Sequence, residues 1–139
     1  MPIVIDCSVL LAWSLAEEEE EAASEAIRRT LETGAVVPQI WWYELRNALL
    51  MNERRGRIAP QQLANMLTDI AALGIEVDSG HDETAMFALA RRHSLTVYDA
   101  AYLEVAFRRD LPLATFDRRL AGAAKAEGVA LIGLPGEGR

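Results

Sequence analysis

Short apolar runs alternate with longer helical patterns along the whole chain, and this alternation limits the possible folds more than any other feature. The first run, residues 2–6, reads Pro-Ile-Val-Ile-Asp and stops at an acid, as a buried parallel strand does. Similar runs occur at 35–38, 75–77, 112–115 and 129–132, and helices are expected at 8–16, 17–32, 40–55, 60–73, 81–92, 97–109 and 118–127. Ser8 is expected to cap the first helix, and Gly34 to end the second. Short strands alternating with helices predict an α/β sandwich with a parallel sheet.

The size of the chain predicts a single domain, and its single cysteine indicates a reducing compartment. A chain of 139 residues, 51% of them hydrophobic, buries enough surface to fold without disulfides, and one domain spanning residues 1–139 is expected. The single cysteine, Cys7, favours the cytoplasm. No window approaches the roughly 18 consecutive apolar residues of a membrane span, and the N-terminus lacks signal-peptide features. No association with a membrane is therefore expected.

The net charge of −7 argues against a protein that coats nucleic acid electrostatically. Much of this acidity is local, because residues 17–21 are consecutive glutamates, which are expected to form a solvated helical first turn. Lys125 is the only lysine among 14 basic residues, so the remaining thirteen are arginines, many of them in adjacent pairs. Guanidinium groups suit phosphate well, although solvated helix faces are the alternative interpretation of these pairs.

Three aspartates stand where predicted strands end or predicted helices begin. Asp6 ends the first strand, Asp117 follows the strand at 112–115, and Asp99 begins a helix. Ligands of open α/β sheets bind beyond the carboxyl ends of the strands, so these aspartates are candidate site residues. Helix capping is the alternative for each of them; it explains Asp99 well and Asp6 poorly, because Ser8 already offers a cap there.

Glu44 is expected to lie in apolar surroundings. Its neighbours on a helix are mostly apolar, such as Trp41, with Asn47 one turn later. Burying an unpaired carboxylate costs several kcal/mol, so Glu44 needs a cation, a hydrogen-bond donor or a proton. Glu104, by contrast, has Arg108 four positions later and is expected to form an exposed ion pair.

If these four carboxylates converge, they require a cation, because anions in one pocket repel each other. The hypothetical site contains Asp6, Glu44, Asp99 and Asp117, with Ser8, Asn47 and Thr115 as neutral neighbours. A set of oxygen ligands favours Mg²⁺ or Mn²⁺, and the two histidines and one cysteine make a zinc cluster unexpected. Sites of this kind serve phosphate chemistry.

The aromatic cluster Trp41-Trp42-Tyr43 begins a predicted helix. At least one of its tryptophans is expected in the core, and stacking on nucleobases is the alternative role. His81 and His93 show no ligand spacing and are expected at the surface.

Four stretches of the chain resemble the PIN-domain ribonucleases, specifically the VapC-type toxins of bacterial and archaeal toxin–antitoxin pairs. The first reads Val-Ile-Asp-Cys-Ser at 4–8, and the second runs from Pro38 to Leu49 and contains Glu-Leu-Arg-Asn-Ala-Leu at 44–49. The third reads Thr-Val-Tyr-Asp-Ala-Ala-Tyr-Leu at 96–103, and the fourth Leu-Pro-Leu-Ala-Thr-Phe-Asp at 111–117. They occur in the family's order, and the resemblance extends from about residue 3 to 132.

The resemblance implies a PIN-like three-layer α/β/α sandwich with a short-stranded, mainly parallel central sheet. It also implies a Mg²⁺- or Mn²⁺-dependent endoribonuclease toxin that hydrolyses RNA, forms a homodimer and binds a cognate antitoxin that occludes the site. The family's catalytic, metal-binding acids carry over onto Asp6, Glu44, Asp99 and Asp117, and its neighbouring polar positions onto Ser8, Asn47 and Thr115. Arg118, next to Asp117, is the candidate for contacting RNA phosphates.

Two other classes of α/β protein also place acids after the first strand. Aspartate-nucleophile phosphatases need a second aspartate two residues later, where this chain has Ser8. Phospho-receiver domains need a lysine after a late strand, whereas Lys125 lies inside the last predicted helix. A catalytically inactive PIN-fold module that binds proteins is the remaining alternative to the endoribonuclease.

Overall fold

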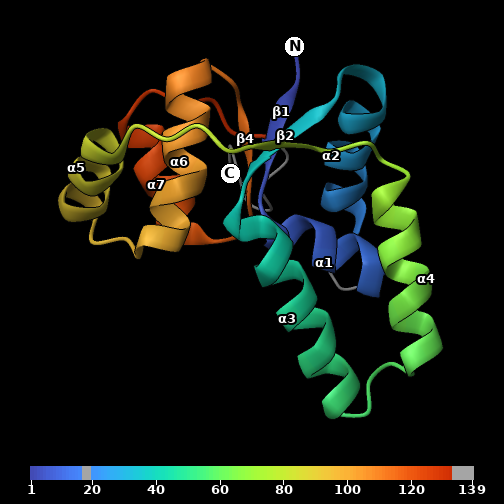
Figure 1. The fold of residues 1–139 in the computed structure, drawn as a ribbon. Helices are drawn as coiled ribbons and strands as arrows, with labels where there is room; N and C mark the ends of the chain where they lie inside the picture. The colour runs from blue at the N-terminus through green and yellow to red at the C-terminus, as the bar shows by residue number, and fades with distance from the viewer. Residues whose placement is uncertain (17–19, 133–139) are drawn as a thin grey trace.

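The computed structural model describes residues 1–16 and 20–132 of the chain. In this part, four strands alternate with seven helices (Figure 1). Their order is β1 (Ile3–Ile5), α1 (Cys7–Leu15), α2 (Glu20–Thr33), β2 (Ala35–Pro38), α3 (Ile40–Arg54), α4 (Pro60–Ala71), β3 (Glu76–Asp78), α5 (Glu83–His93), α6 (Val97–Arg109), β4 (Leu113–Ala114) and α7 (Arg118–Ala126). The elements match the expected alternation. Residues 17–19 of the glutamate run lie outside the described residues.

The four strands form one parallel sheet in the order β3-β2-β1-β4. Val4 at the centre pairs with Val36 of β2 on one side and with Leu113 of β4 on the other. The chain thus builds the sheet outward from β1 to β3 and then returns to the other side of β1. That reversal of strand order occurs between β1 and β4, which is where open α/β sheets bind ligands.

Helices cover both faces of this sheet and give the three layers expected. The helix α6 packs against β1 and β2 on one face, while α2 packs against β1 on the other, with the sheet between them (Figure 1). The strands β1, β2 and β4 are buried along their whole length, because helices cover both faces of the sheet there. The edge strand β3 is exposed at Glu76 and Val77. Among the described residues, no helix is both long and apolar enough to cross a membrane.

Two expectations about the elements are wrong. Ser8 does not cap α1, which begins one residue earlier, at Cys7, with Asp6 in the cap position. The run at 129–132 is not a strand but forms one isolated bridge between Leu131 and Leu113, since β4 offers only two residues for pairing. The expected helix end at Gly34 is confirmed, because this residue has a φ of +95°, which side chains disfavour.

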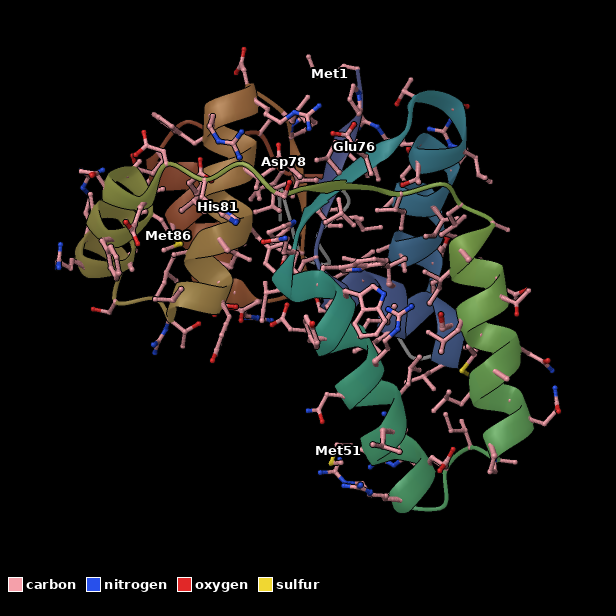
Figure 2. The ribbon with its side chains drawn as sticks, in the orientation of Figure 1. Met1, Met51, Glu76, Asp78, His81 and Met86 are labelled. Atoms are coloured by element: carbon pink, nitrogen blue, oxygen red, sulfur yellow. The ribbon has the colours of Figure 1, made fainter. Side chains whose placement is uncertain are left out.

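An ionic network joins α6 to the edge strand β3. Glu104, which was expected at the surface, is 2% exposed, and its carboxylate accepts a 2.6 Å hydrogen bond from Arg108. Arg108 also donates to Asp78 at 3.1 Å, and Arg109 bridges Asp78 and Glu76 at 3.1 and 2.7 Å. Figure 2 shows the two acids, Glu76 and Asp78, on the edge strand β3. The i, i+4 spacing predicted the ion pair correctly, but the exposure was wrong because α6 is the central helix of its layer and is covered by its neighbours.

Candidate active site

The candidate site lies at the carboxyl ends of β1 and β4. Asp6 follows β1 directly, and Asp117 is separated from the last residue of β4 by Thr115 and Phe116. Because β1 and β4 are parallel neighbours, both aspartates leave the sheet at the same edge. The fold therefore brings together residues from opposite ends of the sequence at the point where strand order reverses.

Asp6 is held in place by two hydroxyl groups. Thr115 donates a hydrogen bond of 2.7 Å and Ser8 one of 2.9 Å, both to Oδ2 of Asp6, which is 7% exposed. Each hydroxyl also accepts a backbone N–H: that of Phe116 at 3.1 Å for Ser8, and that of Asp117 at 3.0 Å for Thr115. Two of the three expected neutral neighbours, Ser8 and Thr115, thus link the segments after β1 and β4 by hydrogen bonds and fix the carboxylate of Asp6.

Glu44 is held by a residue to which the sequence analysis gave no role. The hydroxyl of Tyr102 on α6 donates a 2.7 Å hydrogen bond to Oε1 of Glu44 on α3. Tyr102 is fully buried, and burial together with the charges of Asp6 and Glu44 raises its pKa, so the hydroxyl stays protonated and remains a donor. One signal was available: Tyr102 lies three residues after Asp99 and so shares its face of the helix.

Helix capping explains one of the three aspartates. Oδ1 of Asp117 accepts the backbone N–H of Leu120 at 3.0 Å, so Asp117 is the N-cap of α7. For α6, however, the cap is Thr96, whose hydroxyl accepts the N–H of Asp99 at 3.1 Å. Asp6 occupies a cap position but makes no side-chain cap bond. Capping therefore accounts for Asp117 and leaves the carboxylates of Asp6 and Asp99 to be explained otherwise.

The four carboxylates lie near enough to influence one another's ionisation. Burial raises the pKa of Asp6, and the charge of Asp117 adds to this, while the Thr115 and Ser8 hydroxyls oppose it. Burial and the charges of Asp6 and Asp99 likewise raise the pKa of Glu44. Burial and the charges of Asp117 and Asp6 also raise the pKa of Asp99. A shared negative field of this kind disfavours the ionised forms until a cation compensates it.

The carboxylates do not form a finished coordination sphere. Within the described residues, no three acidic, histidine or cysteine side chains are arranged as a group that could hold a metal ion. The donor set nevertheless fits a hard cation, since it consists of oxygens whose charges are mutually unfavourable. Glu44, Asp99 and Asp117 are only partly buried, which leaves their side chains room to turn toward such an ion.

The remaining predicted residues lie farther from this centre. Asn47 is exposed one turn after Glu44, and Arg118 is exposed at the start of α7. The positive charge of Arg119, the residue after Arg118, opposes the rise in the pKa of Asp99 without outweighing it. Arg119 also donates to the backbone carbonyl of Ser94 at 3.3 Å, which holds it beside the site.

The aromatic cluster divides between core and surface. Trp41 is buried at 7% exposure, as expected for at least one of the tryptophans. Trp42 and Tyr43 are 46% and 67% exposed, and the guanidinium of Arg46 lies 3.7 Å above the centre of the Trp42 ring. These two exposed rings are therefore candidates for stacking on a base, the alternative role expected for the cluster.

Comparison with known proteins agrees with the α/β fold. The model of the PIN domain family matches residues 3–126. Ribonuclease VapC3 of Pyrobaculum aerophilum is 34% identical over 124 residues, which cover 87% of this chain and 93% of that protein.

Two solved structures share the fold. The crystal structure of PAE2754 from Pyrobaculum aerophilum superposes with a TM-score of 0.70 at 24% identity, covering 94% of this chain and 83% of the other. FitAcB from Neisseria gonorrhoeae gives a TM-score of 0.57 at 17% identity, covering 94% of this chain and 96% of the other. At these identities the two structures support the fold alone.

Proposed function

The chain belongs to the PIN-domain family, and from that membership we propose that it is a VapC-type endoribonuclease, the toxin of a toxin–antitoxin pair. The main support is its relationship to ribonuclease VapC3, which extends over most of both chains. The residues that carry the resemblance also meet at the edge of the sheet where this fold class binds ligands.

Asp6, Glu44, Asp99 and Asp117 would hold one or two divalent cations, Mg²⁺ or Mn²⁺. Three of these carboxyl groups have pKa values raised by burial and by one another, so a cation relieves the repulsion between them. When bound, such an ion supplies electrophilic assistance by offsetting the negative charge of the phosphodiester.

The chain's own residues would do the positioning and the proton transfer. Thr115 and Ser8 fix Asp6, and Tyr102 fixes Glu44, so two of the carboxylates point in defined directions. One carboxylate of the site acts as general base toward the attacking water. Water attacks the phosphorus, the bond from phosphorus to the 3′-oxygen breaks, and the leaving 3′-oxygen takes up a proton. The products then carry a 5′-phosphate and a 3′-hydroxyl, and the 2′-oxygen of RNA takes no part. Arg118 and Arg119 would bind phosphates of the strand.

Within the structure, the observation that supports this proposal is that burial and the charges of neighbouring acids of the set raise the pKa values of Asp6, Glu44 and Asp99. The test is cleavage of total RNA by the purified protein, free of antitoxin, with Mg²⁺, with Mn²⁺ and with EDTA. Glu44→Gln serves as the inactive variant and Glu53→Gln, on the same helix, as its matched control.

Discrete fragments that require the metal, persist in Glu53→Gln and vanish in Glu44→Gln are expected. No cleavage by a folded protein in either metal would favour the inactive, protein-binding alternative. Cleavage that survives both EDTA and Glu44→Gln would remove the four carboxylates from the mechanism.

The wider assignments follow from the same family relationship. We propose that residues 1–139 form a single PIN domain, that the protein is a homodimer acting in the cytoplasm, and that a cognate antitoxin occludes the site. Co-purification with the product of a neighbouring gene tests the binding of an antitoxin. Light scattering of the separated protein then tests whether it is a homodimer.

A further inference from the structure

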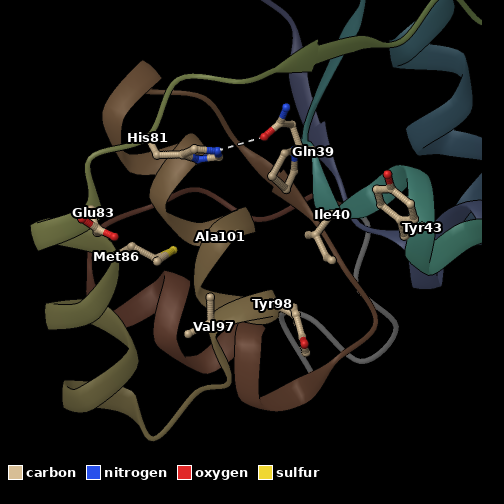
Figure 3. Close-up of a pocket in the computed structure, with 10 residues that line it drawn as sticks. Gln39, Ile40, Tyr43, His81, Glu83, Met86, Val97, Tyr98 and Ala101 are labelled. Carbon is tan, nitrogen blue, oxygen red and sulfur yellow. Dashed lines mark hydrogen bonds between the residues drawn. The ribbon is translucent and has the colours of Figure 1, made fainter.

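A cavity of about 710 Å³ lies between the start of α3, the start of α5 and the start of α6. Figure 3 shows its walls converging from these segments, with Tyr43 and Tyr98 on one side and Met86 on the other. Its volume falls within the range of small-molecule sites, which are about 300–1,000 Å³. None of the four carboxylate residues of the candidate active site lines this cavity.

The cavity adjoins the candidate active site through two exposed tyrosines. Tyr43 directly precedes Glu44, and Tyr98 directly precedes Asp99. Their side chains are 67% and 57% exposed, although both are large aromatic groups. The cavity is therefore lined by residues that are direct chain neighbours of two of the four carboxylate residues.

The opposite end of the cavity is polar. Nε2 of His81 and Oε1 of Gln39 lie 3.4 Å apart at this end (Figure 3). An amide and an imidazole together provide both donors and acceptors, which is what the edge of a nucleobase requires. The walls between the two ends are largely apolar and include Met86 and Val97.

The charges of the lining disfavour a phosphate inside the cavity. Glu83 contributes a carboxylate, and no arginine or lysine is among the residues that line it. The part of an RNA strand that this cavity suits is therefore a base, while the phosphate stays at the carboxylates or at the arginines of α7.

We propose that this cavity binds one unpaired nucleobase of the RNA substrate, that of the nucleotide next to the scissile phosphate. This inference rests on the proposed ribonuclease function and extends it to the choice of cleavage site. Tyr98 and Tyr43 supply the stacking surface, and Gln39 and His81 contact the edge of the base.

The test combines a variant of the protein with a change in the substrate. An RNA oligonucleotide that the wild type cleaves at one bond is prepared with the base removed from the nucleotide on either side. For one of the two positions, the abasic change should lower kcat/KM for the wild type by about 5- to 100-fold, the range that base stacking on an aromatic side chain provides. Tyr98→Ala should show a similar loss on the intact RNA but no further loss on the abasic RNA.

Two matched variants separate stacking from structure. Tyr98→Phe keeps the ring and should retain the sensitivity to the abasic change that Tyr98→Ala loses. Phe107→Ala removes an equally exposed aromatic residue, 53% exposed, from the far end of the same helix, and it should retain the full sensitivity to the abasic change.

Three results would overturn the inference. One is cleavage by the wild type that is indifferent to both abasic substitutions. A second is a Tyr98→Ala variant that keeps the full abasic penalty but dissociates from dimer to monomer, which would assign the cavity to a contact between copies of the chain. Failure of the wild type to cleave any RNA would instead overturn the proposed function itself, and the inference with it.

Discussion

The hydroxyl of Thr115 donates a 2.7 Å hydrogen bond to Oδ2 of Asp6, across a separation of 109 residues in the chain. The same oxygen of Thr115 accepts the backbone N–H of Asp117. One side chain thus fixes the carboxylate after β1 and the turn after β4, so Thr115 sets the distance between two of the proposed ligands.

Thr115→Val should therefore impair the site without changing the volume of the core. The variant leaves the buried Asp6 with one donor fewer, and we expect about 10- to 100-fold lower activity, as is typical when a residue supporting a ligand is lost. The free energy of unfolding should fall by about 1–3 kcal/mol. Thr30→Val is the control, because Thr30 is equally buried but only bonds to the carbonyl of Ala26 within α2. Equal activity losses in both variants would contradict a specific role for Thr115.

The raised pKa of Glu44 should be visible as a dependence of stability on pH. Burial, with the charges of Asp6 and Asp99, raises this pKa in the folded state, so the folded protein binds protons more readily than the unfolded chain. Stability from this group is fully present below its ordinary pKa of 4.5 and is lost as the pH rises through the raised value. In EDTA, Glu44→Gln should accordingly be more stable than the wild type at pH 8, and this difference should shrink toward zero below pH 4.5.

Urea unfolding between pH 3.5 and 8 measures this difference, with Glu53→Gln as the control for losing one charge from α3. A wild type that is more stable than Glu44→Gln at pH 8 in EDTA would mean that the ionised carboxylate is already compensated by groups of the protein.

Divalent cations should stabilise the folded protein through the same carboxylates. At a concentration of 100 times the dissociation constant, a bound ion adds about 2.7 kcal/mol to the free energy of unfolding. We expect Mg²⁺ or Mn²⁺ to raise the melting temperature of the wild type at pH 7.5 and to leave that of Asp6→Asn nearly unchanged. Asp69→Asn, an exposed position on α4, should respond as the wild type does. An identical rise in all three proteins would place the binding of the ion elsewhere.

Breaking the ionic network of α6 should cost far more stability than breaking a surface network does. Arg108→Met leaves Glu104 buried without its partner, and we expect a loss of about 3–5 kcal/mol in the free energy of unfolding. Adding Glu104→Leu should recover most of this loss, since both charges are then gone. As a control, Arg28→Met breaks two ion pairs that are exposed on α2, and it should cost far less, because solvent screens these pairs. Similar losses in the two single variants would refute the importance of burial here.

The arginine at the start of α7 should affect the binding of RNA but not the chemistry. Arg118→Gln should raise KM severalfold, leave kcat unchanged and reduce the slope of log KM against log salt concentration by about one unit. Arg54→Gln, at the far end of α3, should change none of these. A lower kcat with an unchanged salt slope would mean that Arg118 acts on the reacting phosphate itself.

The order and kind of the elements could be predicted from the sequence because their signals are local. Apolar runs, helix-ending residues such as Gly34 and the acids after strands each depend on a few neighbouring residues. The resemblance to PIN-domain ribonucleases supplied the three layers, and the family match and the sheet topology confirm them.

What the sequence did not reveal depends on contacts between distant segments. The partnership of Tyr102 with Glu44 spans 58 residues, and the burial of Glu104 depends on how α6 is covered by other elements. Serine often caps helices, yet the hydroxyl of Ser8 instead donates to Asp6 and accepts the backbone N–H of the distant Phe116. The selection of the four carboxylates as ligands stays a prediction that the experiments above must test.

The adjacency of β1 and β4 also has a consequence during synthesis of the protein on the ribosome. β1 is the first strand to leave the ribosome and β4 the last, so the nascent chain holds Asp6 long before it holds Asp117. Until residue 117 has emerged, neither the hydroxyl of Thr115 nor the fourth carboxylate exists near β1. The ribonuclease proposed above would therefore lack its assembled carboxylate site, and so be inactive toward RNA, until the segment through Asp117 has left the ribosome.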